Sequence, residues 1–509
     1  MTNALAYLIT LALIVAHSAP ASSVSRGNIQ RAIAEQASVS IPPTPAGKKL
    51  DAFLSALNTG DRTTLRAFFA DNMEMSPDEP PSAIDDITNH YLGLYQQSRG
   101  LTLGKIRESS PARIRAVVQA NSTGVWSEIA IFITAKPPKY DEAVPPFKIV
   151  GIGFGTTTAP EELMGRDKLS SRDIRARVDT LLNTLVAADS FSGVVYVSKG
   201  AEPVYARAFG LASRTWSIPN RLDTRFNLAS ITKMFTAVAV AQLVEQGKLS
   251  FSDTVGDVLP DYPNKEVAQK VTLHQLLSHT SGLIGARAMA EKNPQPQKAR
   301  TVGEMLKQFV SEPLSFPPGQ RFDYSNAGYI LLGAVIEKAS GQTYYDYMRD
   351  HVFKPAGMRD TDFYELDTEP RHLATGFMDG PGGTRLSNIF DLDIKGSPAG
   401  GAYSTGPDMA RFHAALTGLK LLREDTLGKL WAGVTEEPGR GSKYAYGARI
   451  ERYNGTRIVS HGGGWKGITN QFDIYPDSGY TVVVLSNYDD DPSAIAYKLR
   501  EWLTQGSSK

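Results

Sequence analysis

Apolar residues recur at helical spacing in the first part of the chain that has a regular pattern. Leu50, Phe53 and Leu57 lie three or four positions apart, and after a break at Gly60 the pattern resumes with Leu65. Residues at such spacing share one face of an α-helix. The pattern therefore predicts two consecutive amphipathic helices that pack on a common core.

The pattern then turns from helices to strands. Residues 84–97 keep the helical spacing, whereas 114–120, 126–133 and 147–152 are short runs rich in β-branched and aromatic residues. Helices followed by strands indicate an α+β domain, which we place at 46–155. In the order and length of its elements, this segment resembles the cone-shaped domains of the nuclear transport factor 2-like group.

After a linker at 156–170, a second and larger domain is expected at 171–505. It opens with a predicted helix at 171–187, followed by a hairpin of strands at 193–198 and 203–209. Three more strands and a closing helix are predicted near the C-terminus: 444–452, 469–475, 480–486 and 492–504. Strands at both ends with helices between them predict a sheet that is built from the two ends of the domain and flanked by an inserted helical region.

An apolar run at residues 4–16 begins the chain, and a small-residue A-x-A sequence follows at 19–21. Such a run is too short to span a bilayer comfortably, and small residues after it are typical of signal-peptide cleavage. We predict a signal peptide at 1–21, a mobile leader at 22–45, and an exported protein that is periplasmic or secreted. Membrane contact is expected only through this segment. Since no Lys or Arg precedes the apolar run, an uncleaved anchor is the alternative.

Composition and charge narrow the functional classes. The net charge is +1 and neither sign forms a long run, so nucleic acid is not an expected partner. The chain has no cysteine, which excludes disulfides, thiolate nucleophiles and Cys-ligated zinc. It also has no H-E-x-x-H and no G-x-S-x-G sequence, which argues against a zinc hydrolase and an α/β-hydrolase. We predict neither a metal nor a cofactor.

One pair of residues has the spacing of a nucleophile and its base. Ser230 and Lys233 form the only S-x-x-K sequence of the chain, at the start of an apolar run that ends at Gly247. Residues three apart lie on one helix face, so the lysine amine can reach the serine hydroxyl. Burial lowers a lysine pKa and so lets the amine accept the serine proton. Taken alone, a serine at a helix start is usually just a cap.

Two further clusters contain groups that could act on the same substrate. Tyr324 and Asn326 follow a Pro-Pro-Gly turn and precede a helical run. A tyrosine beside a lysine could relay protons, and an asparagine could hydrogen-bond an amide or ester. His461 precedes three glycines, whose backbone could approach a substrate closely and aim an oxyanion N–H. Taken alone, the first cluster is better explained as a helix cap, and the second as a hairpin bend with an ordinary strand-end histidine.

Together, the three clusters resemble the motif set of the serine β-lactamase and penicillin-binding protein superfamily. The resemblance is to the branch that contains class C β-lactamases, D,D-carboxypeptidases, D-aminopeptidases and family VIII esterases. The motifs follow in the order of that family: S-x-x-K at 230–233, Y-x-N at 324–326, and the K-T-G position at 461–463.

The resemblance implies an acyl-enzyme mechanism and a β-lactamase-like fold, which is an α/β (α+β) sandwich of one antiparallel sheet with flanking helices and a helical region. Ser230 would attack the substrate, and Lys233 and Tyr324 would manage its proton. Backbone N–H groups of Ser230 and Gly464 would form the oxyanion hole, while His279 would hold the scaffold. The remaining substrate-binding positions would be Asn326, His461 on the opposite wall, and Gly463.

His461 stands where β-lactamases usually have a lysine. A lysine is a fixed cation that suits a substrate carboxylate, whereas a histidine is mostly neutral at pH 7. This favours a serine hydrolase that acts on a small ester or peptide amide, of esterase or D-amino-acid peptidase type. The alternative is a penicillin-binding, β-lactamase or cell-wall-sensing module that acylates without efficient hydrolysis. For the N-terminal domain we consider a homodimer contact, a lid, or a ligand in its cone.

Overall fold

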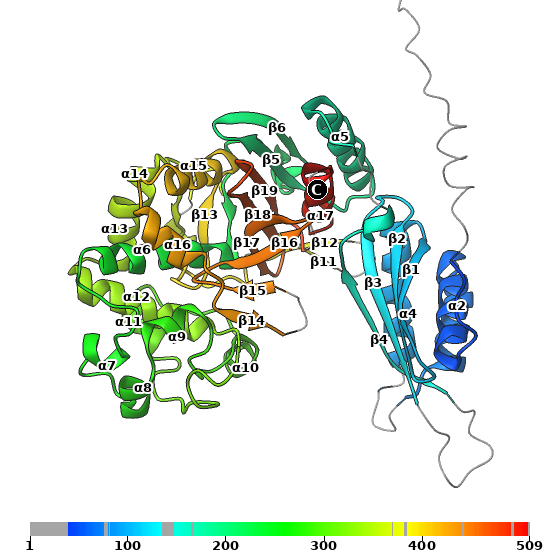
Figure 1. Cartoon of the computed structure of the whole chain (residues 1–509), viewed down its shortest axis with the longest axis horizontal. Helices are drawn as coiled ribbons and strands as arrows, with labels where there is room; N and C mark the ends of the chain where they lie inside the picture. The colour runs from blue at the N-terminus through cyan, green and yellow to red at the C-terminus, as the bar shows by residue number, and fades with distance from the viewer. Residues whose placement is uncertain are drawn as a thin grey trace, which may run out of the picture.

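The computed structural model describes residues 39–75, 80, 82–134, 147–163, 167–368, 370–380, 384–438, 442–489 and 493–506. The predicted signal peptide and most of the predicted leader lie outside these residues. Two domains follow one another along the chain (Figure 1). Within the described ranges, none of the helices has both the length and the apolar character of a membrane span.

The N-terminal domain packs three helices on a four-stranded antiparallel sheet of strand order β1-β2-β3-β4. Its elements are α2 (Pro45–Asn58), α3 (Arg62–Asn72), α4 (Ala83–Ser98), β1 (Leu101–Ser109), β2 (Arg113–Ala120), β3 (Trp126–Ile133) and β4 (Ile149–Thr156). The predicted helices and three predicted strands are present. β1 was not predicted, because its polar residues and central glycine leave no β-branched run.

Aromatic rings fill the space between the helices and the sheet of this domain. Phe53, Phe68, Phe69 and Tyr91 are all buried, and neighbouring ring centroids lie 5.3–6.3 Å apart. Such pairs stabilise a core beyond the area that they bury. The interior of the domain is therefore a packed core, which argues against the ligand-binding cone.

The second domain is built on an eight-stranded antiparallel sheet of order β14-β15-β16-β17-β18-β19-β5-β6. Its strands are β5 (Gly193–Lys199), β6 (Glu202–Phe209), β14 (Thr435–Glu437), β15 (Ser442–Tyr444), β16 (Arg449–Tyr453), β17 (Thr456–Trp465), β18 (Ile468–Tyr475) and β19 (Tyr480–Ser486). β19 pairs with β5 in full register. The prediction of one antiparallel sheet made from both ends of the domain is thus confirmed.

Two details of this sheet differ from the prediction. The run 444–452 is divided into β15 and β16 by a turn that contains Gly447, whose φ is 76°. The cluster with His461 was expected between strands, but it lies inside β17, which pairs with β18 along its length. Glycine is depleted in strands, so the three consecutive glycines prevented the prediction of β17 as a strand.

Helices cover both faces of the large sheet. α5 (Ser171–Ala187) and α17 (Ser493–Thr504) pack on one face, and α17 also contacts β4 of the N-terminal domain (Figure 1). The other face carries the helical region, whose main helices are α6 (Thr232–Glu245), α12 (Asn326–Ser340) and α15 (Gly406–Thr417). Almost every residue of α6 is buried, which is typical of a helix at the centre of a core.

Shorter elements complete the helical region and its connections to the sheet. The helices are α7 (Val255–Val258), α8 (Lys265–Lys270), α9 (Leu273–Leu277), α10 (Ala286–Lys292), α11 (Val302–Leu306), α13 (Tyr344–Tyr347), α14 (Lys354–Ala356) and α16 (Glu424–Leu430). The strands are β7 (Leu211–Ser213), β8 (Ile218–Pro219), β9 (Phe226–Asn227), β10 (Asp362–Phe363), β11 (Phe377–Asp379), β12 (Arg385–Ser387) and β13 (Ala402–Ser404).

A buried ion pair ties α17 to the sheet. Arg500 donates from Nε to Asp473 Oδ2 at 2.6 Å and from Nη2 to Asp473 Oδ1 at 2.9 Å. Glu451 lies 2.9 Å from the same guanidinium. Burial alone would lower the pKa of Arg500, but the two carboxylates raise it well above its ordinary value. Removing the arginine would leave both carboxylates without their cation.

We therefore expect Arg500→Met to reduce the free energy of unfolding by about 3–5 kcal/mol, the usual cost of breaking a buried pair from one side. Urea denaturation at pH 7 measures this. Arg287→Met is the matched control, because it removes an arginine from an exposed ion pair with Glu291, and it should leave the midpoint unchanged. Equal effects of the two variants would show that the buried pair does not stabilise α17.

Candidate active site

Ser230 lies in a short 3-10 turn, η2 (Ala229–Ile231), which leads directly into α6. The residue before it, Ala229, has a φ of 45°, which is uncommon for a residue other than glycine. Asn227 Oδ1 accepts the Ala229 N–H at 2.9 Å, and the Gly401 N–H donates to Ala229 O at 3.3 Å. The prediction that Ser230 lies near a helix N-terminus is therefore confirmed, on a backbone turn that its neighbours hold in place.

Lys233 is the best-defined group of the site. Its side chain is fully buried, and its Nζ lies 3.2 Å from Ser230 Oγ and 2.9 Å from Asn326 Oδ1. A third close contact joins Nζ to the carbonyl oxygen of Ala399. Burial, and secondly the positive charge of Arg449, hold the pKa of Lys233 well below its ordinary value.

The three oxygens around Nζ could accept the three N–H groups of an ammonium, but burial favours the neutral amine. An uncharged lysine has two N–H donors and one lone pair, whereas an ammonium has three donors and no acceptor. The carbonyl oxygens of Asn326 and Ala399 can only accept, so they take the two N–H groups. The lone pair then faces the hydroxyl of Ser230. The geometry gives the serine a base within hydrogen-bond reach.

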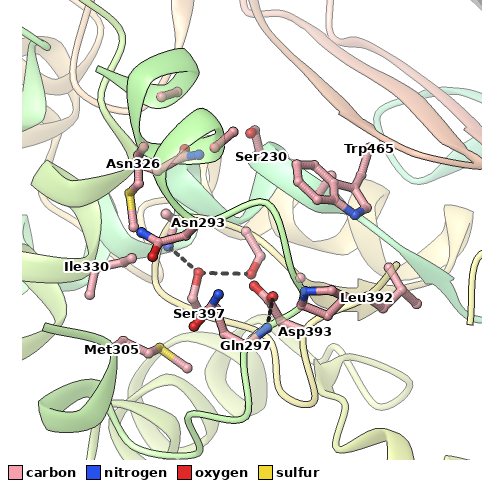
Figure 2. Close-up of a pocket in the computed structure, with 18 of the residues that line it drawn as sticks. Ser230, Asn293, Gln297, Met305, Asn326, Ile330, Leu392, Asp393, Ser397 and Trp465 are labelled. Carbon is pink, nitrogen blue, oxygen red and sulfur yellow. Dashed lines mark hydrogen bonds between the residues drawn. The ribbon is translucent and has the colours of Figure 1, made fainter. Parts of the chain in front are cut away.

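Tyr324 and Asn326 reach this pair from a distant part of the chain. α12 begins at Asn326, and its N-cap residue Ser325 accepts the Gly328 N–H at 3.3 Å. The ring centroid of Tyr324 lies 4.8 Å from Lys233 Nζ. Figure 2 shows Asn326 and Ser230 beside one another on the same edge of the pocket. Two of the three predicted clusters thus meet at the lysine amine.

His279 packs against the ring of Tyr324 and binds the backbone next to it. Its ring centroid lies 4.2 Å from that of Tyr324, and its Nδ1 accepts the Ser325 N–H at 3.1 Å. Burial, and secondly the charge of Lys233, lower the pKa of His279 well below its ordinary value. A neutral ring is required here, because a protonated one could not accept the N–H. His279 therefore positions the backbone between Tyr324 and Asn326.

His461 is placed differently from the prediction. Its side chain is only 1% exposed, with Nε2 3.0 Å from the hydroxyl of Tyr444 and Nδ1 2.6 Å from Gly462 O. Its ring centroid lies 6.4 Å from that of Tyr324. It is absent from the residues that line the pocket beside Ser230. In the described structure, His461 belongs to a buried group around Tyr324 and Tyr444 instead of the opposite wall of the pocket.

The glycines of β17 bring this strand against the turn that carries the nucleophile. A Cβ atom on Gly463 would lie 2.1 Å from the carbonyl oxygen of Leu228, so no larger residue fits. Gly464 is different, because a Cβ there would meet nothing within 4 Å, and its backbone lines the pocket. β17 therefore packs directly against the segment that leads into η2 at Gly463, while Gly464 and Ser230 both face the pocket.

A buried ion pair beside the site was missed by the sequence analysis. Arg449 donates from Nε to Glu437 at 2.7 Å and from Nη2 at 2.9 Å. The guanidinium lies 5.7 Å from the ring centroid of Tyr444, and its charge helps to lower the pKa of Lys233. Glu437 and Arg449 are twelve positions apart and belong to no recognisable sequence motif, so the sequence did not predict their ion pair. Their positions on β14 and β16, next to β15, could have suggested a shared face.

A pocket of about 650 Å³ opens beside Ser230 (Figure 2), within the usual range for small-molecule sites. It lies on the Asn326 side of the nucleophile, between residues 286–308 and 391–401. Both apolar and polar side chains line its walls, among them Met289, Met305, Ile330, Asn293, Gln308 and Asp393. Such walls can hold a substrate group larger than an acetyl.

Known proteins are similar to this chain in sequence and in fold. Residues 178–505 match the family model described as Beta-lactamase. The chain belongs to the beta-lactamase family. Penicillin-binding protein 4* of Bacillus subtilis is 32% identical over 333 residues, which are 62% of this chain and 72% of that protein. Esterase EstB of Burkholderia gladioli is 36% identical over 240 residues, which are 44% of this chain and 60% of that protein.

A solved structure gives the same assignment. The penicillin-binding protein from Bacillus halodurans has a TM-score of 0.57 and 35% identity, and the match covers 62% of this chain and 98% of that one. The predicted β-lactamase-like fold is thus confirmed, and the protein is a serine hydrolase of this family. The family model begins at residue 178, so it does not include the N-terminal domain.

The contact between β17 and η2 leads to a first prediction for the site. Gly463→Ala would push β17 away from Leu228 and should lower kcat/KM on a short-chain ester by at least about a hundredfold, since a 1 Å misplacement can cost this much. Gly464→Ala keeps its N–H and meets open space, so its loss should be tenfold or less. Equal losses would mean that strand position does not matter.

The buried lysine leads to a second prediction, on pH dependence. The neutral amine is the active form, so kcat/KM on an uncharged ester should fall as pH falls through the lowered pKa of Lys233, and should reach its plateau well below pH 10.5. Arg449→Gln removes a positive neighbour, so the acidic limb should move to higher pH. Arg452→Gln, also on β16, is the control. If the acidic limb of the kcat/KM profile stays at the same pH in Arg449→Gln, the proposed electrostatic coupling between Arg449 and Lys233 is contradicted.

Proposed function

We propose that this protein hydrolyses small esters or amides through an acyl-enzyme at Ser230, as an esterase or D-amino-acid peptidase. One observation carries the proposal. A fully buried Lys233 donates to two carbonyl oxygens and directs its remaining position at Ser230 Oγ, 3.2 Å away. This arrangement supplies the adjacent base that a serine hydroxyl needs in order to attack a carbonyl.

The proposed reaction has two halves. Ser230 Oγ bonds to the substrate carbonyl carbon while its proton moves to Lys233, and the N–H groups of Ser230 and Gly464 stabilise the oxyanion. The bond to the leaving group then breaks, and the leaving group takes the proton through Lys233 and Tyr324. In the second half, water attacks the acyl carbon, gives its proton to the same groups, and releases Ser230.

Three features favour an ester or amide over a β-lactam. The K-T-G position carries His461, which is buried against Tyr444 instead of offering a fixed cation to a substrate carboxylate. The cationic side chains that line the pocket are all paired with carboxylates. Among the relatives, EstB is an esterase by name. These features support an uncharged or positively charged acyl group.

We also propose that the protein works after export, in the periplasm or medium. The apolar run at 4–16, the A-x-A sequence at 19–21 and the absence of cysteine support this location. For the N-terminal domain, three helices on a four-stranded sheet support kinship with the nuclear transport factor 2-like group. Its filled core favours pairing of subunits into a homodimer, or a lid, over ligand binding.

A panel of substrates tests the proposed function: short-chain esters, D-amino-acid amides, D-Ala-D-Ala peptides and a cephalosporin. We expect many turnovers per enzyme on at least one ester or amide, and a loss of about a thousandfold or more in Ser230→Ala. One acylation per enzyme without further turnover would favour a penicillin-binding or sensing module. Faster turnover of the cephalosporin than of every ester and amide would make the substrate assignment wrong.

A further inference from the structure

Asp393 is a carboxylate on the wall of the pocket without a protein cation. Figure 2 shows it in the same space as Met305 and Ile330, with Ser230 at the far edge. Asp393 Oδ1 accepts the backbone N–H of Gln297 at 2.8 Å. Among the described residues, no lysine, arginine or histidine nitrogen lies within 4.0 Å of its carboxylate.

The other charges in the pocket are arranged differently. Arg287 pairs with Glu291 at 2.8 Å, Lys395 pairs with Glu365, and Lys466 pairs with Asp391. Each positive group that lines the pocket is therefore matched by a carboxylate of the protein, whereas Asp393 is left over.

The Asp393 side chain is exposed to the space of the pocket, and the protein around that space leaves its carboxylate less hydrated than one on an open surface. Loss of water raises the pKa of Asp393, and the single N–H from Gln297 offsets only part of that effect. A carboxylate that loses more of its water when a ligand fills the pocket is stabilised if that ligand places a cation beside it. A cationic ligand group in the pocket would supply the missing partner.

We propose that Asp393 binds an ammonium group on the acyl part of the substrate, so that the enzyme selects aminoacyl esters or amides. This inference rests on the proposed acyl transfer at Ser230. Asn326 and Ile330 lie one turn apart on α12 and line the same pocket. An acyl group bound at Ser230 can therefore extend past Asn326, place its hydrocarbon against Ile330 and Met305, and direct its ammonium to Asp393.

The same arrangement disfavours an acyl group that ends in a carboxylate. Such a group would bring a second negative charge beside Asp393, and like charges in a desolvated site repel. The charge of the pocket therefore acts in the same direction as the loss of the lysine at position 461.

Matched esters test this inference. The para-nitrophenyl esters of ω-amino acids two to six carbons long are compared with alkanoyl esters of similar length, in the full chain and in Asp393→Asn. The asparagine keeps the shape and an acceptor for the Gln297 N–H, but removes the charge. For at least one chain length, we expect Asp393→Asn to lower kcat/KM on the amino ester tenfold or more, and on the alkanoyl ester less than threefold.

Asp367→Asn is the control for a change in net charge, because Asp367 is a surface carboxylate outside the pocket lining. It should leave both kinds of ester unaffected. Ser230-dependent turnover of the alkanoyl esters, with no preference for any amino ester in the unsubstituted chain, would overturn the role of Asp393 and leave the proposed function intact.

If no ester or amide is turned over, the proposed function is refuted. A binding measurement then still tests whether Asp393 binds an ammonium group. Calorimetry with the Ser230→Ala protein compares n-pentylammonium with n-pentanol. Tighter binding of the ammonium, lost in Ser230→Ala/Asp393→Asn, is the expected result. Equal affinities, or a preference that survives the Asp393 substitution, would overturn the inference.

Discussion

The chemistry of this protein depends on a lysine amine that has been taken out of water. Isolated charges are costly in a protein interior, and a buried lysine relieves this cost by giving up its proton. Lys233 is held in this state by its burial in α6 and by the nearby charge of Arg449, while two carbonyl oxygens from distant parts of the chain fix the position of its amine. The same burial that stabilises the core therefore creates the base next to Ser230.

Several elements depend on this position. α12 must begin at Asn326 to place an acceptor at the amine, and His279 fixes the backbone just before it. β17 must approach η2 closely, which a glycine at 463 permits. Arg449 adds a positive charge that further disfavours protonation of Lys233. The site thus forms only when the sheet and the helical region are packed together.

Much of the fold could be predicted from periodicity, because long amphipathic helices and β-branched runs are recognisable from the local sequence. α5 was predicted at its observed bounds, and β5 and β19 within one residue of theirs. β17 was missed because its glycines serve a contact with Leu228, and a contact between distant segments leaves no local pattern. The motifs located Ser230 and Lys233 correctly near a helix start. Periodicity alone could not show that Asn326 would meet them.

The groups that tune the site were the hardest to foresee. Arg449 matters because Glu437 and Tyr444 lie beside it in the folded sheet. Asp393 becomes part of the pocket wall only when the segment with Gln297, 96 positions earlier, packs against it. A single charged residue in a loop gives no sign of such a neighbour. The proposed substrate preference therefore depends on tertiary contacts that the motifs do not describe.

Detection of the acyl-enzyme tests the central claim most directly. Trypsin cleaves after Arg225 and Lys233 and so releases the peptide 226–233, which contains Ser230. After rapid acid quench during turnover of an ester, mass spectrometry should find this peptide heavier by the mass of the acyl group less one hydrogen, and the adduct should disappear as the substrate is consumed. Turnover with no adduct on this peptide, or with the adduct on another peptide, would contradict acyl transfer at Ser230.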